Sequence, residues 1–540
     1  MIHKVKTYTI DGLIGHEIVI EIGTSRSLPT IQIIGLPDAM IKESKERIRS
    51  ALRSSHLEIP PRKFILNLSP SDIRKSGTSF DMPMSVGLIW SIVWDKATNV
   101  ELLEKGLFFG EVGLDGELKR INGLLPMVIA AKKNGYSDFI VPMENMYELE
   151  YIAGIRLYPI SHCGQLINYF IHGHTPVYHE DNKSLDMLIQ WQTRDHDFQD
   201  IRWHLVAKRA MSIAAVGLHN ILMVGSPGSG KTLLAKALQS ILPPLNHYEI
   251  LEVSQIYSVV GKLDKHRPLI VHRPFRPIHH TASKISIIGW WSSLRPWEVS
   301  LAHRGILFMD ELTEFPRETL EVLRQPIEDK TITISRVTWS INYPASFMFV
   351  SAMNPCKCGY YKDKEKQCSC TLFDIKKYQS KISGPLLDRI DMILEIPREK
   401  VETILESRII NHTRWIEKTM WSSNTHEEET AWLYTSDQLR EKVLQAWEIQ
   451  QKRYRDKPIH CNAQLSAKDI HTYIQLDSDA EQFLTQVSKR MSLSSRVIHR
   501  MIKLARSIAD IGWSEWVATH HIAESLQYRS KTMFIEHEGV

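Results

Sequence analysis

The sequence has few cysteines and no long apolar run. Six cysteines among 540 residues are too few for a disulfide-stapled scaffold, so a cysteine cluster here would indicate metal binding in a reducing compartment. The longest apolar stretch, SVGLIWSIVW at residues 85–94, is far shorter than the roughly 20 residues that a membrane-spanning helix needs. The first residues, MIHKVKTYTIDGLIG, contain no hydrophobic region of a secretory signal. We therefore expect a cytoplasmic protein with no membrane partner.

A strong excess of either charge is also missing. The formal net charge is +4 at pH 7, which permits a nucleic-acid partner without requiring one, because local patches matter more than the total. The hydrophobic fraction, 43%, supplies enough material for packed cores. At about 150 residues per domain, the length predicts about three or four domains.

The residue pattern divides the chain into four regions. Residues 1–165 alternate strand-like and helical runs and predict a mixed α/β domain. Residues 166–195 are polar and rich in His and Asp, which is typical of a linker. Residues 196–398 alternate short apolar strands with helices, as in a parallel sheet with crossover helices. Residues 399–540 lack strand signals and predict an all-helical domain.

The segment NILMVGSPGSGKTLLAKAL contains the spacing of a phosphate-binding loop. An apolar strand leads into the loop and a helix follows it, so a chance glycine-rich turn is a poor alternative. The glycines let backbone N–H groups turn toward phosphates, Lys231 should reach the β- and γ-phosphates, and Thr232 should bind Mg²⁺. The predicted ATP-binding residues are Gly225, Ser226, Pro227, Gly228, Ser229, Gly230, Lys231 and Thr232.

Polar residues follow the next two apolar strands. GILFMDEL ends in Asp310 and Glu311, and SFMFVSAMN ends in Asn354. Ligands of α/β proteins sit at the carboxyl ends of the strands, so Asp310 is placed to hold Mg²⁺ and Glu311 to deprotonate the attacking water. A surface Asp-Glu pair is the alternative reading. The Asn354 amide could bind that water or the γ-phosphate.

Two arginines lie outside this strand pattern. Either could stabilise negative charge on the γ-phosphate of a nucleotide that a neighbouring subunit binds. Arg389 precedes the apolar strand DMILEIP, and Arg496 lies at the start of the helix SSRVIHRMIKLA. For either arginine taken alone, a structural salt bridge is the more ordinary interpretation.

Four of the six cysteines lie in the stretch MNPCKCGYYKDKEKQCSC. Cys356, Cys358, Cys368 and Cys370 form the pattern C-x-C-x₉-C-x-C, and four thiolates suit tetrahedral Zn²⁺. The single residue within each cysteine pair is fewer than zinc sites usually have. The pattern also lacks the C-x-x-C spacing of redox pairs. Free buried thiols remain the alternative. We expect a structural zinc knuckle whose lysine-rich tip could contact DNA or a neighbouring subunit.

The chain resembles the YifB/ComM family, which are magnesium-chelatase-like AAA+ ATPases with an N-terminal Lon-protease-like (S5-like) domain. The stretches that carry this resemblance span nearly the whole chain: GSPGSGKT, RPFRPIHHTAS, EVSLAHRGILFMDEL, LRQPIEDKTITISR, AMNPCKCGYY, ISGPLLDRID and LQYR. The resemblance implies an AAA+ core, a C-terminal helical lid and three further roles. Asn354 would be sensor 1, Arg389 the arginine finger acting in trans, and Arg496 sensor 2.

The resemblance also implies a function. Members of the family form hexameric rings that pump DNA, and ComM promotes branch migration during natural transformation. Single-stranded and branched DNA, and recombination proteins, are then the expected partners. Two insertions would face the pore, at residues 282–300 and in the hairpin at residues 330–344. Their basic residues are the expected DNA contacts: Lys284, Arg295, Lys330 and Arg336.

The N-terminal region resembles Lon but departs from it at the expected base. KSGTSFDMP places Ser79 at the position of the Lon nucleophile, whereas INGLLPMV places Leu125 where the Lon lysine belongs. A leucine accepts no proton, so we expect a proteolytically inactive domain, with Lys119 or Lys132 as remote substitutes. The predicted ATPase region departs from the YifB/ComM family as well: Trp203 and His204 in DIRWHLVAK stand where relatives usually have Gly-Gln, which is expected to alter the adenine pocket.

Three functions fit these features. An ATP-driven DNA translocase is the leading hypothesis. A metal-chelatase-type motor acting on a protein partner shares the ATPase core, although the Lon-like domain argues against it. A scaffold that binds ATP without turnover is disfavoured by the complete set of predicted catalytic residues.

Overall fold

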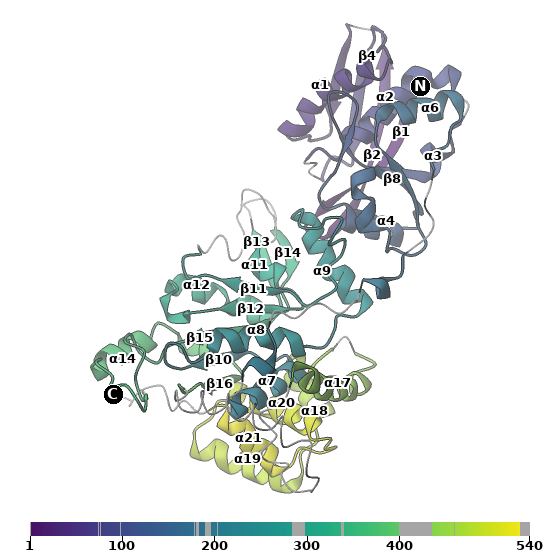
Figure 1. Ribbon diagram of the computed structural model, residues 1–540. Helices are drawn as coiled ribbons and strands as arrows, with labels where there is room; N and C mark the ends of the chain where they lie inside the picture. Colours follow the sequence, from purple (N-terminus) through teal and green to yellow (C-terminus); the bar gives the residue numbers. More distant parts are fainter. Residues whose placement is uncertain are drawn as a thin grey trace, which may run out of the picture.

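The computed structural model is elongated, with an N-terminal α/β region at one end, a central α/β region and a helical region at the other end (Figure 1). It describes residues 2–529 apart from residues 27, 74, 76, 98, 178, 180–182, 189–195, 202–203, 283–296, 336–339, 399–434 and 458. Within these residues, no helix is both long and apolar enough to cross a membrane.

A four-stranded sheet begins the chain. Its strands are β1 (Ile2–Asp11), β2 (Ile14–Ser25), β3 (Thr30–Ile34) and β4 (Lys63–Ser69), in the order β1-β2-β4-β3. Only the β3–β4 pair is parallel. Every second residue of β4 is buried, which is typical of a sheet with one face on a core. The other strands match the alternating runs of the sequence, whereas β1 was not predicted.

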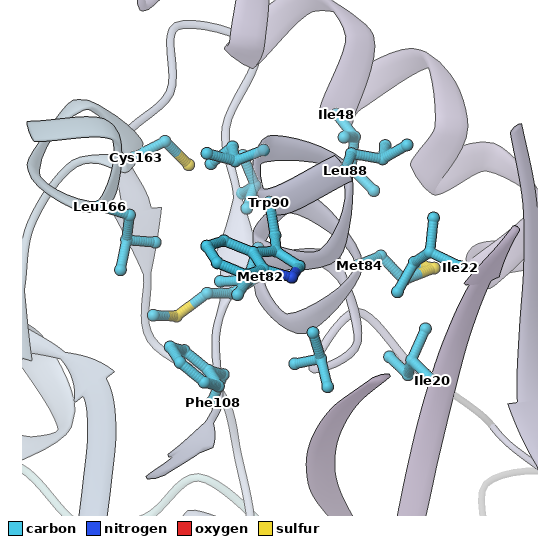
Figure 2. Close-up of a cluster of buried hydrophobic side chains, with 14 of the residues drawn as sticks. Ile20, Ile22, Ile48, Met82, Met84, Leu88, Trp90, Phe108, Cys163 and Leu166 are labelled. Carbon is cyan, nitrogen blue, oxygen red and sulfur yellow. The ribbon is translucent and has the colours of Figure 1, made fainter. Parts of the chain in front are cut away.

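Helix α2 (Asp81–Val93) lies at the centre of this N-terminal core. Almost all of its residues are buried, because β2, α1 (Ala39–Ser54), β5 (Gly106–Phe108) and α6 (Cys163–His172) surround it. Figure 2 shows Met82, Met84 and Leu88 of this helix among side chains from those four elements. This all-round burial explains why residues 85–94 read as a continuous apolar run.

A second, parallel sheet completes the N-terminal region. It has the order β5-β8-β9, with β8 (Asp138–Pro142) and β9 (Arg156–Ile160), and α4 (Leu124–Lys133) lies beside it. The shorter elements are α3 (Glu101–Lys105), β6 (Glu111–Val112), β7 (Leu118–Lys119) and α5 (Met146–Leu149). Helix α6 runs through the boundary predicted at residue 165, so the folded unit extends to His172 before the polar segment begins.

The central region contains a five-stranded parallel sheet in the order β11-β12-β15-β10-β16. The strands are β10 (Ile221–Val224), β11 (Phe275–Ile278), β12 (Ile306–Met309), β15 (Met348–Met353) and β16 (Met392–Glu395). Strands β10, β12 and β15 are buried along their whole length, which explains their uninterrupted apolar sequences. The predicted parallel sheet with flanking helices is confirmed.

Helices and one hairpin surround this sheet. The helices are α7 (Leu205–Gly217), α8 (Lys231–Ile241), α9 (His247–Val259), α11 (Glu298–Leu301), α12 (Arg317–Val322), α13 (Arg324–Asp329), α14 (Leu372–Gln379) and α15 (Gly384–Leu387). The hairpin pairs β13 (Thr331–Ser335) with β14 (Ser340–Pro344) in antiparallel register, as the alternating sequence predicts.

Five helices form the described part of the C-terminal region. They are α17 (Ser436–Arg453), α18 (Ala467–Tyr473), α19 (Ser478–Arg490), α20 (Ser495–Ile511) and α21 (Thr519–Gln527). Apolar residues of α17 and α20 join α7 and α8 in one core. The lid therefore packs directly on the helices that flank the sheet.

Helix α9 joins the central region to the N-terminal region. Its apolar residues share a core with α4, and the Gly123 N–H donates a 3.0 Å hydrogen bond to the Ser258 carbonyl. The Ser258 hydroxyl also lies 2.7 Å from the buried Glu148 carboxyl, whose pKa is raised by its burial.

Candidate functional site

The segment from Gly225 to Gly230 connects β10 to α8 at the carboxyl end of the sheet. Gly228 and Gly230 have φ angles of 79° and 85°, which side chains on other residues disfavour. Helix α8 begins at Lys231, so its N-terminal N–H groups and its dipole point toward this loop. The local structure is the anion-binding turn that the glycine spacing predicts.

Lys231 lies inside this loop. Its Nζ donates to the carbonyl oxygens of Gly225, at 2.7 Å, and Ser226, at 2.9 Å. Asn354, directly after β15, presents its Oδ1 at 3.3 Å from the same ammonium. The structure thus brings together the phosphate-binding lysine and the amide predicted from two separate strand ends.

The ammonium of Lys231 is poorly solvated in this position. Burial lowers its pKa to about 8, although the carboxylates of Asp310 and Glu311 act in the opposite direction. Thr232 Oγ1, one residue further along α8, donates a 2.7 Å hydrogen bond to Asp310 Oδ2. A hydroxyl and a carboxylate so placed are oxygen ligands of the type that Mg²⁺ takes beside phosphates.

Glu311 has a left-handed backbone, with φ of 52°. A non-glycine residue in this region carries strain of the kind that often marks functional positions. Its Oε2 lies 3.0 Å from Nδ1 of His280, which follows β11. His280 was not singled out from the sequence. The only local signal is the paired histidines of RPIHHTAS, whose rings are 4.1 Å apart.

His204 also reaches the phosphate-binding loop. Its Nε2 lies 3.2 Å from the Ser229 carbonyl, and its backbone is left-handed, with φ of 69°. Burial lowers the pKa of the imidazole, which favours the neutral form. His204, one of the two residues that depart from the family pattern, therefore contacts the phosphate-binding loop itself. Trp203 lies outside the described residues.

Arg389 and Arg496 lie at the opposite end of the sheet. The Arg389 carbonyl accepts a 3.0 Å hydrogen bond from Asn220, which precedes β10, whereas the phosphate-binding loop follows β10. Both guanidinium groups pair with Glu328 of α13, at 3.0 Å for Arg496. Neither arginine joins the Lys231 site of its own chain, as the trans role predicted for Arg389 requires.

The predicted DNA contacts are described only in part. Lys330 lies at the base of the hairpin, half-buried, in the wall of a cavity of about 850 Å³ between the central region and the lid. Arg496 and Glu328 line the same cavity. Lys284, Arg295 and Arg336 lie outside the described residues, so their contact with DNA stays a prediction.

The four clustered cysteines converge. All four sulfur atoms lie within 4.8 Å of one another, and Cys368 Sγ lies 3.7 Å from Cys356 Sγ and 3.5 Å from Cys358 Sγ. Four sulfurs bound at 2.3 Å to a tetrahedral zinc ion would be about 3.8 Å apart, so the donor set fits that ion. Although its burial acts in the opposite direction, backbone hydrogen bonds lower the pKa of Cys358 to about 6, whereas burial raises the pKa of Cys356 and of Cys368.

The N-terminal region carries Ser79 at the position expected for the Lon nucleophile. Ser79 is buried just before α2, and Leu125 is fully buried in α4. The Lys132 ammonium donates to the Ala153 carbonyl, and Lys119 is exposed on β7. In the part of the chain that the structure describes, no lysine is recorded in contact with Ser79.

Comparison with known proteins identifies the class. The family model described as "Magnesium chelatase, subunit ChlI" matches residues 197–404, "Subunit ChlI of Mg-chelatase" matches residues 20–145, and "Magnesium chelatase, subunit ChlI C-terminal" matches residues 434–529. Together with the parallel sheet and its phosphate-binding loop, these matches define an AAA+ protein of the magnesium-chelatase type.

Several relatives match along nearly the whole chain. YifB of Salmonella typhimurium is 34% identical over 520 residues, covering 96% of this chain and 95% of the relative. Competence protein ComM of Haemophilus influenzae is 32% identical over 521 residues, covering 96% of each chain. Lon protease 2 of Bacillus subtilis is 28% identical over 125 residues, covering 23% of this chain and 21% of the protease. The chain belongs to the YifB/ComM family of magnesium-chelatase-like proteins, as its motifs predicted.

Proposed function

We propose that this protein is an ATP-driven ring translocase that moves branched DNA during homologous recombination, as in natural transformation. The observation that carries the ATPase part is the convergence of Lys231, Thr232, Asp310 and Asn354 at one end of the sheet. The similarity of this chain, over 96% of its length, to a protein named competence protein ComM supports the recombination role.

Each residue of the site would have a separate role in ATP hydrolysis. Lys231 and the loop N–H groups would bind the β- and γ-phosphates, while Thr232 and Asp310 would hold Mg²⁺, which would supply positive charge to offset the negative charge of the phosphates. Glu311 would accept a proton from the attacking water, and His280 would orient its carboxylate. Asn354 would position the water or the γ-phosphate.

The arginines give a physical reason for a ring. Arg389 and Arg496 face away from their own nucleotide site, so they would act on a nucleotide held by the next subunit. A closed ring supplies every site with such a neighbour, and the family resemblance implies six subunits.

We also propose that Cys356, Cys358, Cys368 and Cys370 hold Zn²⁺. The distances between their sulfur atoms support this ligand set. The ion would act structurally, since all four positions are taken by thiolates and no position is open for water.

A metal-chelatase-type motor acting on a protein partner is the alternative. The three matching family models, all described by a magnesium-chelatase subunit, favour it. Branch migration of a labelled four-way DNA junction separates the two functions. We expect ATP-dependent conversion of the junction to duplex products by the full-length protein and none by Lys231→Ala. Absence of conversion by the wild-type protein at every ATP and DNA concentration would favour the alternative.

A further inference from the structure

The cysteine knuckle, defined as residues 356–370, lies directly against the phosphate-binding loop. The hydroxyl of Ser226, the second residue of that loop, donates a hydrogen bond to the Asp363 carboxylate, and Ser226 is buried. Asp363 lies within the nine residues that separate the two cysteine pairs. A side chain of the knuckle therefore holds a residue of the ATP site.

A second contact brings the knuckle backbone against a proline ring of the phosphate-binding loop. A Cβ atom added at Gly359 would lie 2.5 Å from Cδ of Pro227, the third residue of the phosphate-binding loop. Gly359 also has a φ angle of 88°, so both its conformation and its close approach require glycine. Its N–H donates a 3.0 Å hydrogen bond to the Cys356 carbonyl, which places this contact in the turn that carries the first cysteine pair.

Asp363 is itself fixed by the fold of the knuckle. Its Oδ1 accepts hydrogen bonds from the backbone N–H groups of Glu365, at 2.9 Å, and Lys366, at 3.0 Å. Its own N–H donates to the Tyr360 carbonyl at 3.1 Å. The carboxylate is thus held on one side by its own turn, while its other oxygen reaches Ser226.

Apart from the cysteines, the knuckle has few interactions that would keep it ordered. It contains no helix or strand, and of its residues only Cys356 and Gly359 are buried. In a small loop of this kind, the free energy of metal binding is largely the free energy that orders the loop. Loss of the metal would therefore release Asp363 and Gly359 together.

We propose that the knuckle is a metal-dependent clamp on the phosphate-binding loop, with Asp363 as the positioning residue, so that metal in the knuckle raises the affinity for ATP. The inference rests on the proposed ATPase function. A phosphate-binding loop that is ordered before ATP arrives saves the cost of ordering it on binding.

The first test measures the affinity of the full-length protein for a fluorescent ATP analogue, together with its zinc content by mass spectrometry. We expect about one zinc ion per chain. Removal of the metal with a chelator should raise the Kd roughly tenfold, and added Zn²⁺ should restore it. A Kd that is unchanged after the metal has been removed, or a purified protein without metal, would overturn the proposal.

The second test keeps the metal in place. Asp363→Ala should retain its zinc and its melting temperature but bind the analogue roughly tenfold more weakly, and chelation should weaken it little further. Glu365→Ala removes an exposed carboxylate two residues away and should behave as wild type. If Asp363→Ala keeps its zinc and binds the ATP analogue with wild-type affinity, the proposed clamp does not exist. This result decides the question even if the chelator in the first test makes the wild-type protein aggregate.

Lys231→Ala separates this proposal from the proposed function. It should lose nucleotide binding and keep its zinc. A zinc-loaded wild-type protein that binds no nucleotide would refute the ATPase function itself. Normal nucleotide binding whose affinity depends on neither the metal nor Asp363 would refute the clamp alone.

Discussion

The guanidinium groups of Arg389 and Arg496 share one carboxylate, that of Glu328, at the end of the sheet opposite the phosphate-binding loop. Two positive side chains from different regions, the central sheet and the lid, are thus held together by one acidic residue of α13. In a ring, a neighbour's γ-phosphate would compete with Glu328 for both arginines. The pairing would keep these cations in place until a neighbouring subunit binds.

Complementation between two inactive variants should reveal the trans role of Arg389. Arg389→Ala should bind ATP normally but lose most of its hydrolysis, by a factor of about 10³ or more. Lys231→Ala should lose nucleotide binding. Mixed rings should regain activity, because an intact loop in one subunit then meets an intact arginine from its neighbour. The measurement is the ATPase rate of the mixture compared with each variant alone.

The matched control is Arg389→Ala mixed with Glu311→Gln. It should also regain activity, since the two changes again leave some interfaces with both intact groups. Mixtures as inactive as their components, although mixed rings are shown to form, would place Arg389 outside the active site.

The affinity for ATP should fall as the pH rises above about 8. Burial lowers the pKa of Lys231 to about 8 in the empty site, so the lysine is mostly charged at pH 7 and mostly neutral at pH 9. Bound phosphates favour the charged form, and binding at high pH therefore requires uptake of a proton. We expect the Kd for an ATP analogue to rise about tenfold between pH 7 and pH 9, measured by fluorescence at constant ionic strength.

Lys231→Arg provides the comparison, because an arginine stays charged throughout this range. Its affinity can be weaker overall, but it should not depend on pH in the same way. A wild-type Kd that is constant from pH 7 to pH 9 would show that Lys231 keeps its charge in the empty site.

The Glu311→Gln exchange should separate binding from turnover. An amide cannot accept the proton of the attacking water, so hydrolysis should fall at least about 100-fold while the affinity for ATP stays within about threefold of wild type. Steady-state ATPase assays and analogue binding measure the two quantities. Turnover close to the wild-type rate would assign the role of base to another group.

The N-terminal region should have no peptidase activity. Leu125 is fully buried at the position where the resemblance to Lon expects a lysine, so Ser79 lacks the lysine that would activate its hydroxyl. Purified protein should leave casein intact in the presence of ATP and Mg²⁺, as judged by the release of labelled peptides. Cleavage that is abolished by Ser79→Ala would contradict this account.

Much of the ATP site could be predicted from the sequence because its parts are local. The glycine spacing before Lys231 encodes a turn, and apolar strands that end in Asp310 or Asn354 place those side chains at one edge of a parallel sheet. The hairpin β13–β14 was equally readable from its alternating residues.

The contacts that connect the site to the rest of the molecule were not predictable in this way. His280 beside Glu311, Glu328 between two arginines and Asp363 on Ser226 all join residues far apart in the chain. Each depends on how loops pack, and neither periodicity nor spacing encodes such packing. Strand β1 was missed because its alternation is broken by buried polar residues such as Thr7 and Thr9.

If ATP hydrolysis drives movement on DNA, as we propose, the ATPase rate of the full-length protein should depend on DNA. Forked and four-way DNA should raise the rate several-fold over that of the protein alone, and Glu311→Gln should show neither the basal nor the stimulated rate. Single-stranded, duplex and branched DNA are compared at equal nucleotide concentration. A rate that none of these DNAs changes would show that hydrolysis is not coupled to DNA and would leave a motor that acts on another partner.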